Sequence, residues 1–143
     1  MSASPTIDAR LGELLDDFEL LGGWEAQIEY VIDLGRTLEP LTDAERNDAN
    51  KVRGCASQVW LVLERSGEAL SFRGDSDSPL VKGLIALLVR LYSGAPAAEI
   101  LAFDVRGAFA RLGLAGSLTA QRSNGLASMV ARIRDTASAL ATA

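Results

Sequence analysis

The chain has 143 residues, 48% of them hydrophobic and 23% charged, as is usual for a soluble globular protein. This length predicts a single domain over residues 1–143 with a hydrophobic core of its own. The formal net charge of −5 argues against binding to nucleic acid or to an anionic membrane surface, because both need a basic face.

Missing residue types exclude several kinds of chemistry. The chain has no histidine, which excludes Cys–His and Ser–His catalytic pairs and imidazole metal ligands. A single cysteine excludes an internal disulfide and a metal site of about four thiolates, so we expect no metal and no tightly bound cofactor. The acidic start does not fit a signal peptide, and no apolar stretch reaches the ~18 residues of a membrane span. We therefore expect a cytoplasmic protein.

Two amphipathic helices are predicted first. Apolar residues recur every three or four positions over 7–21 and again over 24–38, and the second helix ends before Pro40. Thr42 and Glu45 then form the pattern of a capping box, here in a short turn. The polar residues that follow are expected to form a loop.

A small antiparallel sheet is predicted next. Short apolar runs over 57–64 and 69–73 flank a Ser-Gly turn and read as a hairpin, and 51–53 is expected to add a third short strand. The segment 74–78 should break the hairpin, and Ser78 or Asp77 should cap the helix that follows.

The rest of the chain is predicted to be helical. Residues 80–92 are apolar on nearly every face and should form the central core helix. Shorter helices are expected over 96–101 and 105–112, then a loop over 113–119. The last amphipathic helix is expected over 126–140, with its charged residues outside: Arg132, Arg134 and Asp135. The predicted fold class is α+β, with about three strands packed against several helices.

The only cysteine lies in the segment Val52–Trp60, whose sequence is VRGCASQVW. Gly54 allows a tight, projecting turn before it. The cations Lys51 and Arg53 are expected to lower the pKa of the Cys55 thiol and so favour the reactive thiolate. A lone thiol can exchange sulfur only with another molecule. The alternative for Cys55 is a buried structural thiol, a common fate of free cysteine.

Three segments resemble the SufE family of sulfur-acceptor proteins. The cysteine segment is similar to the sulfur-accepting loop of that family, residues 74–85 to its strand-to-helix junction, and residues 118–126 to the segment that carries an arginine before the last helix. The resemblance implies a fold related to the scaffold proteins on which iron–sulfur clusters are assembled.

The resemblance also implies a function. A pyridoxal-phosphate-dependent cysteine desulfurase (SufS- or CsdA-like) would pass persulfide sulfur to Cys55, and Cys55 would pass it to an iron–sulfur scaffold complex. The chain would also stimulate the turnover of the desulfurase. Because cluster scaffolds need several thiolates and this chain has one, we expect a carrier.

Five further residues are expected to support Cys55. Arg122 would lend charge to the thiolate or pair with a carboxylate, for which Asp77 is the candidate; its alternative is an ordinary surface arginine. Gly54 would shape the loop, and Ser57 and Gln58 would donate or accept hydrogen bonds there.

Two other functions stay open at the level of sequence. One is a stand-alone thiol enzyme, such as a peroxide reductase or a general sulfurtransferase, which the absence of histidine disfavours. The other is a non-catalytic regulator that acts on the desulfurase by binding alone. Replacing Cys55 by Ser separates the regulator from the carrier, because a regulator would lose nothing.

Overall fold

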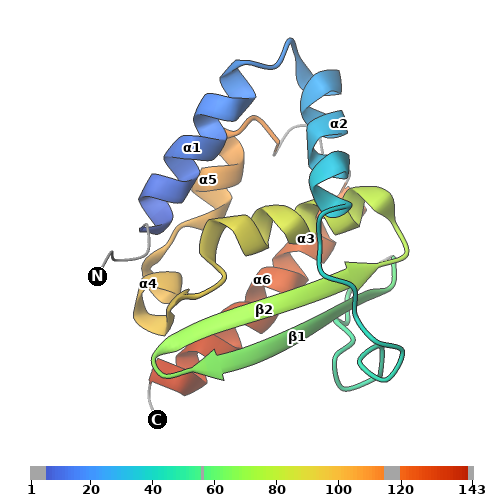
Figure 1. The fold of residues 1–143 in the computed structure, drawn as a ribbon, viewed down its shortest axis with the longest axis vertical. Helices are drawn as coiled ribbons and strands as arrows, with labels where there is room; N and C mark the ends of the chain where they lie inside the picture. The colour runs from blue at the N-terminus through green and yellow to red at the C-terminus, as the bar shows by residue number, and fades with distance from the viewer. Residues whose placement is uncertain (1–5, 56, 115–119, 142–143) are drawn as a thin grey trace.

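The computed structural model describes residues 6–55, 57–114 and 120–141. Its helices are α1 (Ile7–Glu19), α2 (Trp24–Gly35), α3 (Pro79–Tyr92), α4 (Ala97–Ala102), α5 (Val105–Arg111) and α6 (Ala120–Ala141). The strands are β1 (Val59–Ser66), β2 (Ala69–Ser76) and β3 (Ala95–Pro96), in the order β1-β2-β3 with antiparallel pairing throughout (Figure 1). The predicted α+β class is confirmed.

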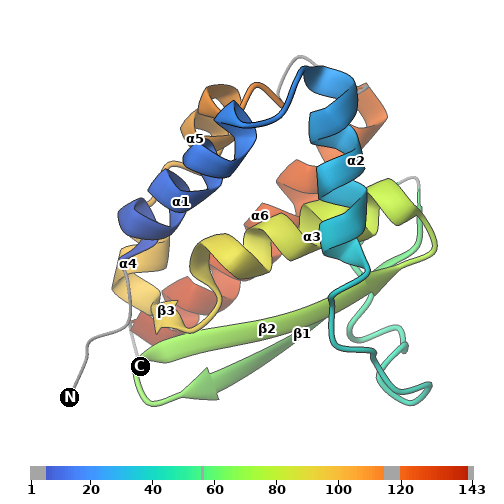
Figure 2. The same cartoon turned by 45° about the horizontal axis from the view of Figure 1, so that its top comes forward.

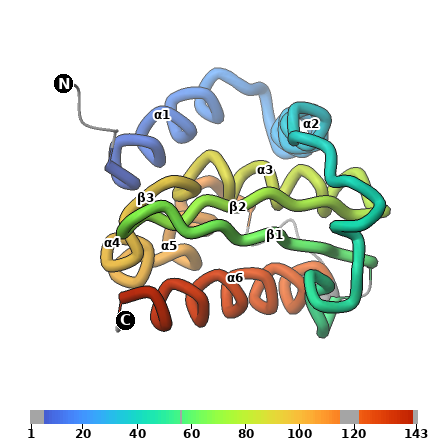
Figure 3. The backbone as a smooth tube through the Cα atoms, turned by 60° about the horizontal axis from the view of Figure 1, so that its bottom comes forward, coloured from blue at the N-terminus to red at the C-terminus, as the bar shows by residue number. Residues whose placement is uncertain are grey.

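One face of the sheet carries the core. The antiparallel register places Leu61 opposite Gly74, and alternate residues of β2 are buried on the same face. Helix α3 packs against β2 on the inside and against α2 on the outside, while α6 packs against α4 and β1. Figures 2 and 3 show the resulting arrangement, with α1 and α2 outermost, then α3, and with α6 beside the strands.

Helix α3 is the centre of the core, as predicted. Its first residue is Pro79, and the Ser78 hydroxyl caps it by accepting a hydrogen bond from the Val81 N–H. Gly83 allows α2 to approach closely, because a Cβ atom at Gly83 would lie 2.3 Å from the carbonyl oxygen of Val31. The cap at Ser78 therefore stabilises the first turn of α3, and close packing against α2 holds its side.

Two predictions about the sheet are wrong in detail. Lys51 forms only an isolated bridge with Trp60, so 51–53 is not a strand, and the third strand is β3. The hairpin does not break at Gly74 but continues to Ser76, because Gly74 packs against Leu61 and Ile85, where a side chain would not fit.

The bounds of the helices also differ from the prediction, most of all in α2 and α6. Helix α2 ends at Gly35, three residues early, and α6 begins at Ala120, six residues before the predicted start. Residues 122–124 are exposed, so they carry no apolar period by which a helix could be predicted. Most of the predicted loop, residues 115–119, lies outside the described residues. In the part of the chain that is described, no helix is long and apolar enough to cross a membrane.

Candidate functional site

Cys55 lies at the tip of a narrow loop that precedes β1. The base of the loop is closed by two backbone hydrogen bonds: the Val52 N–H donates to the Val59 oxygen at 2.8 Å, and the Leu61 N–H donates to the Asn50 oxygen at 2.9 Å. Val52 and Val59 are both buried. The loop is therefore anchored at its base and projects from there.

Gly54 supplies the turn before the cysteine, as predicted. Its φ angle is +87°, in the left-handed region that favours glycine. A Cβ atom there would also lie 2.7 Å from the Ser128 Oγ on α6. The loop thus rests directly on α6, and its backbone conformation favours glycine at this position.

The Cys55 thiol is half-buried and points at the first turns of α6. Its Sγ is 3.6 Å from the carbonyl oxygen of Gly125, to which it can donate a weak hydrogen bond. Gly125 lies against the sulfur, since a Cβ atom there would be in ordinary van der Waals contact with Sγ, at 3.5 Å. Cys55 also packs against the hydrophobic core. The thiol therefore rests against Gly125 on α6, and we call this position its seat.

Burial raises the pKa of the Cys55 thiol above its ordinary value. The expected lowering by Lys51 and Arg53 is wrong for this conformation, because desolvation of the thiolate is the effect that acts on the sulfur. Arg53 is exposed, and the backbone carbonyl of Lys51 faces α6. Burial thus disfavours the thiolate, the reactive form of the thiol, and in this sense the seated thiol is protected.

Asp77 supports the other side of the loop. Its Oδ1 accepts a hydrogen bond from the Gln58 N–H at 3.0 Å, and its own N–H donates to the Gln58 oxygen at 3.3 Å. Asp77 is therefore not the cap of α3, a role that Ser78 takes. Ser57, also predicted for the site, is half-buried.

Arg122 lies exposed on the first turn of α6, three residues before Gly125. Its helix is thus the one that seats the thiol. The proposed pairing of Arg122 with Asp77 stays a prediction.

Sequence reasoning missed the role of the arginines on α6. Arg132 and Arg134 were expected outside, but both have hydrogen bonds to distant parts of the chain. The Arg132 guanidinium donates to the carbonyl oxygens of Lys51 (3.2 Å) and Ala49, and Arg134 donates to that of Leu101 in α4 (3.0 Å). The available signal was spacing: Gly125, Ser128 and Arg132 recur at steps of three and four, which places them on one helix face.

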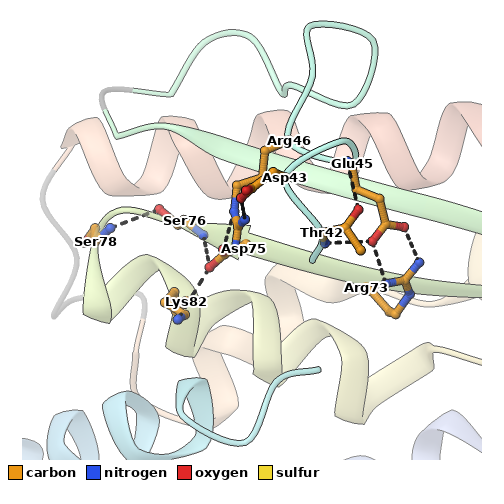
Figure 4. A network of polar contacts seen from close by, with 9 residues as sticks. All are labelled: Thr42, Asp43, Glu45, Arg46, Arg73, Asp75, Ser76, Ser78 and Lys82. Atoms are coloured by element: carbon orange, nitrogen blue, oxygen red, sulfur yellow. Dashed lines mark hydrogen bonds and ion pairs between the residues drawn. The ribbon is translucent and has the colours of Figure 1, made fainter. Parts of the chain in front are cut away.

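The segment that leads to the loop, residues 41–50, lies across the sheet; we call it the strap. Figure 4 shows it on the opposite side of the strands from α3 and joined to them by polar contacts. Thr42 and Glu45 form the predicted capping box, with reciprocal hydrogen bonds of 3.0 and 3.2 Å. Glu45 also pairs with Arg73 of β2, and this contact lowers the pKa of Glu45 to about 2.

A second ion pair holds the strap to the sheet. Arg46 binds Asp75 at 2.8 Å, and Lys82 of α3 lies 3.4 Å from the same carboxylate (Figure 4). Burial alone would raise the pKa of Asp75, but hydrogen bonds from Arg46 and from the Ser76 N–H, together with the charge of Lys82, lower it. Asp75 therefore joins the strap, the sheet and α3 as an anion.

Within the described ranges, no three acidic, cysteine or histidine side chains come together in a way that could hold a metal ion. The chemistry that this site offers is that of one thiol in a seat.

Comparisons with known proteins identify the family of the chain. The model of the SufE family, described as an Fe–S metabolism associated domain, matches residues 12–137. The chain belongs to the SufE family. Family membership places it in Fe–S metabolism and implies a cysteine desulfurase as its partner.

Relatives extend the match over nearly the whole chain. A SufE-like protein of Rhizobium etli is 49% identical over 139 residues, 94% of each chain, and one of Rhizobium meliloti is 44% identical over 131 residues, 89% of this chain and 94% of that one. The solution structure of a hypothetical protein from Thermus thermophilus has a TM-score of 0.77 at 18% identity, and the match covers 94% of this chain and 97% of that one. The chain therefore shares its fold with the Thermus thermophilus protein.

Proposed function

We propose that Cys55 accepts persulfide sulfur from a pyridoxal-phosphate-dependent cysteine desulfurase, stimulates its turnover in the cytoplasm, and passes the sulfur to an iron–sulfur scaffold complex. The observation that carries the proposal is the seat of the only thiol: half-buried, held by one weak hydrogen bond of 3.6 Å, in a loop directly after a glycine in the left-handed backbone region.

The reaction is a transfer of neutral sulfur with no net oxidation. The Cys55 thiolate attacks the outer sulfur of the desulfurase persulfide, the new S–S bond forms on Cys55, and the old S–S bond breaks. The desulfurase thiolate is the leaving group, and it takes up the proton that Cys55 gave up. Cys55 then carries the persulfide.

The seat gives this carrier a resting state. The raised pKa disfavours the thiolate, so the free thiol reacts more slowly with oxidants and alkylating agents than an exposed thiol would. Docking on the desulfurase would draw the loop away from Gly125, return the thiol to solvent, and bring its pKa down toward the ordinary value. The partner thus activates the nucleophile by removing it from its seat.

Four residues take supporting roles in this proposal: Arg122, Asp77, Ser57 and Gln58. Asp77 and Gln58 hold the downstream end of the loop in place while the tip moves. Arg122, on the helix that faces the thiol, would stabilise the thiolate or the persulfide once the loop opens.

The test is intact-mass spectrometry after mixing the protein with a cysteine desulfurase and free cysteine, without reductant. We expect a gain of one or more sulfur atoms, absent in Cys55→Ser, together with faster desulfurase turnover. If Cys55→Ser still stimulates turnover, the protein is a regulator that acts by binding. If the wild-type protein reduces peroxide or moves sulfur without a desulfurase, it is a stand-alone thiol enzyme.

The pH dependence of alkylation provides a second test. The pKa of Cys55 is raised in the folded protein, so the neutral thiol stabilises the seated conformation at a pH below the ordinary thiol pKa. This stabilisation is lost as the pH rises through the pKa of the folded protein. The rate with iodoacetamide should therefore rise at higher pH than for an unfolded control peptide. Adding the desulfurase should shift the profile toward the control. Equal profiles for protein and peptide would contradict the protected state.

A further inference from the structure

Arg132 makes a contact that the proposed sulfur transfer does not explain. Its guanidinium crosses from α6 to the chain just before the cysteine loop and donates to two backbone carbonyl oxygens, those of Ala49 and Lys51. Charged hydrogen bonds to a backbone are stronger than neutral ones. Two such hydrogen bonds from one planar guanidinium fix both the distance and the orientation of residues 49–51 relative to α6.

The two carbonyls flank the base of the loop. Between them lies Asn50, whose carbonyl accepts from Leu61, and directly after them Val52 donates to Val59. The chain here is therefore held from two directions, by β1 through the backbone ladder and by α6 through Arg132.

The downstream end of the loop is held as well, because Asp77 binds the backbone of Gln58. The chain between the two anchors is short. It runs from Arg53 to Ser57 and includes Gly54, which has a positive φ angle and, as a glycine, more backbone freedom than any other residue. Among the described residues of this span, the contacts with α6 are the weak hydrogen bond of Cys55 to Gly125 and the close approach of Gly54 to Ser128.

We propose that Arg132 is a positioning residue that clamps the base of the loop onto α6, so that only residues 53–57 leave the seat when Cys55 collects sulfur. This inference rests on the proposed function, because it assumes that Cys55 must move to react. It assigns a role to a side chain well outside the cysteine segment and predicts how far the thiol can travel.

The clamp limits the reach of the thiol. Each residue of an extended chain spans roughly 3.3–3.6 Å, so three residues from Val52 to Cys55 allow the thiol to project about 10 Å from the fixed base. The donor sulfur of the partner must therefore come within about 10 Å of the base of the loop at Val52. A clamped base also means that docking has to order only a few residues, which lowers the entropy cost of binding.

The first experiment needs no variant. Amide hydrogen exchange at Val52 and Leu61 reports the two hydrogen bonds of the base. We expect both amides to stay protected in the complex with a desulfurase while Cys55 becomes open to alkylation. Loss of protection at both amides on docking would overturn the proposal, because the base would then move with the tip.

The second experiment removes the clamp. Arg132→Met has a side chain of similar length without a donor, and we expect alkylation of free Cys55 by iodoacetamide to be roughly tenfold faster, with faster exchange at Val52 and Leu61. In sulfur transfer we expect the KM of the desulfurase for this variant to rise several-fold with kcat unchanged, because docking must now order the base. Arg132→Lys keeps the positive charge but has a single nitrogen in place of the planar guanidinium, and it should fall between the two.

The matched control is Arg134→Met, which removes a guanidinium from the same helix that also binds a backbone carbonyl, but that of Leu101 in α4. It should leave the alkylation rate of Cys55 unchanged. The same increase in both variants, or none in Arg132→Met, would overturn the clamp. Because alkylation and exchange of the free protein involve no desulfurase, they test the clamp even if no sulfur is transferred.

Discussion

Helix α3 and the strap lie on opposite faces of the same sheet and are held by different kinds of contact. Helix α3 is buried on most of its faces and makes contacts with α2 and β2 through apolar side chains. The strap is largely polar and is held by ion pairs from Glu45 to Arg73 and from Arg46 to Asp75.

This difference separates stability from motion. Apolar contacts in a close-packed core act together, so α3 can move only if the domain unfolds. Polar contacts at a partly exposed surface exchange for water at a small cost, so a segment held by them opens locally. The tip of the loop with Cys55 is held to α6 by one weak hydrogen bond and shares this property, which suits a thiol that has to leave its seat.

The largest effect is expected in the core. Leu88→Ala in α3 should lower the free energy of unfolding by about 2–5 kcal/mol, because Leu88 is completely buried and a cavity would remain. Urea denaturation measures this. The control Leu20→Ala, at an 87% exposed leucine, should change stability by no more than about 0.5 kcal/mol. Similar losses in both variants would break the distinction between core and surface.

The next effect concerns the anchor of the strap. Asp75→Asn keeps the shape but removes the charge that binds Arg46 and Lys82, and we expect a loss of about 2 kcal/mol by urea denaturation. Asp43→Asn removes the fully exposed partner of the same arginine and should have little effect. If Asp75→Asn were neutral, the strap would be held by something other than this ion pair.

A smaller effect of opposite sign is expected at the seat of the thiol. Gly125→Ala should stabilise α6 by about 0.5–1 kcal/mol, and alkylation of Cys55 should slow several-fold, since the added methyl group lies against Sγ. In α1, Gly12→Ala has open space around it and should stabilise its helix without any effect on Cys55. Faster alkylation of Gly125→Ala would show that the seat cannot accept a methyl group.

The smallest effect is expected at Glu45 and depends on pH. Because its folded pKa of about 2 is below the ordinary value, the pairing with Arg73 stabilises the protein above about pH 4.5 and is lost as the pH falls toward 2. Glu45→Gln should therefore melt slightly below the wild type at pH 7. The two melting curves should converge in acid, and a constant difference at every pH would assign the effect to packing.

The sequence determined the elements whose signals are local. The apolar period of α1 and α3, the cap at Ser78, the capping box at Thr42 and the hairpin turn each depend on neighbours within about four residues, and all are present in the structure. The single thiol behind a glycine is also readable, because Gly54 adopts the left-handed backbone that glycine allows.

Tertiary structure decided what depends on distant partners. Strand β3 exists because Ala95 and Pro96 meet β2 in space, and 51–53 is not a strand because the chain turns away after one bridge. The protonation state of Cys55 was likewise not readable, since desolvation against α6 outweighs the charges next to it in sequence. Arg132 was assigned to the solvent face for the same reason: the carbonyls that it binds lie 81 and 83 residues away. The sequence determines interactions between neighbouring residues, whereas the burial of a side chain depends on distant residues that pack against it in the folded protein.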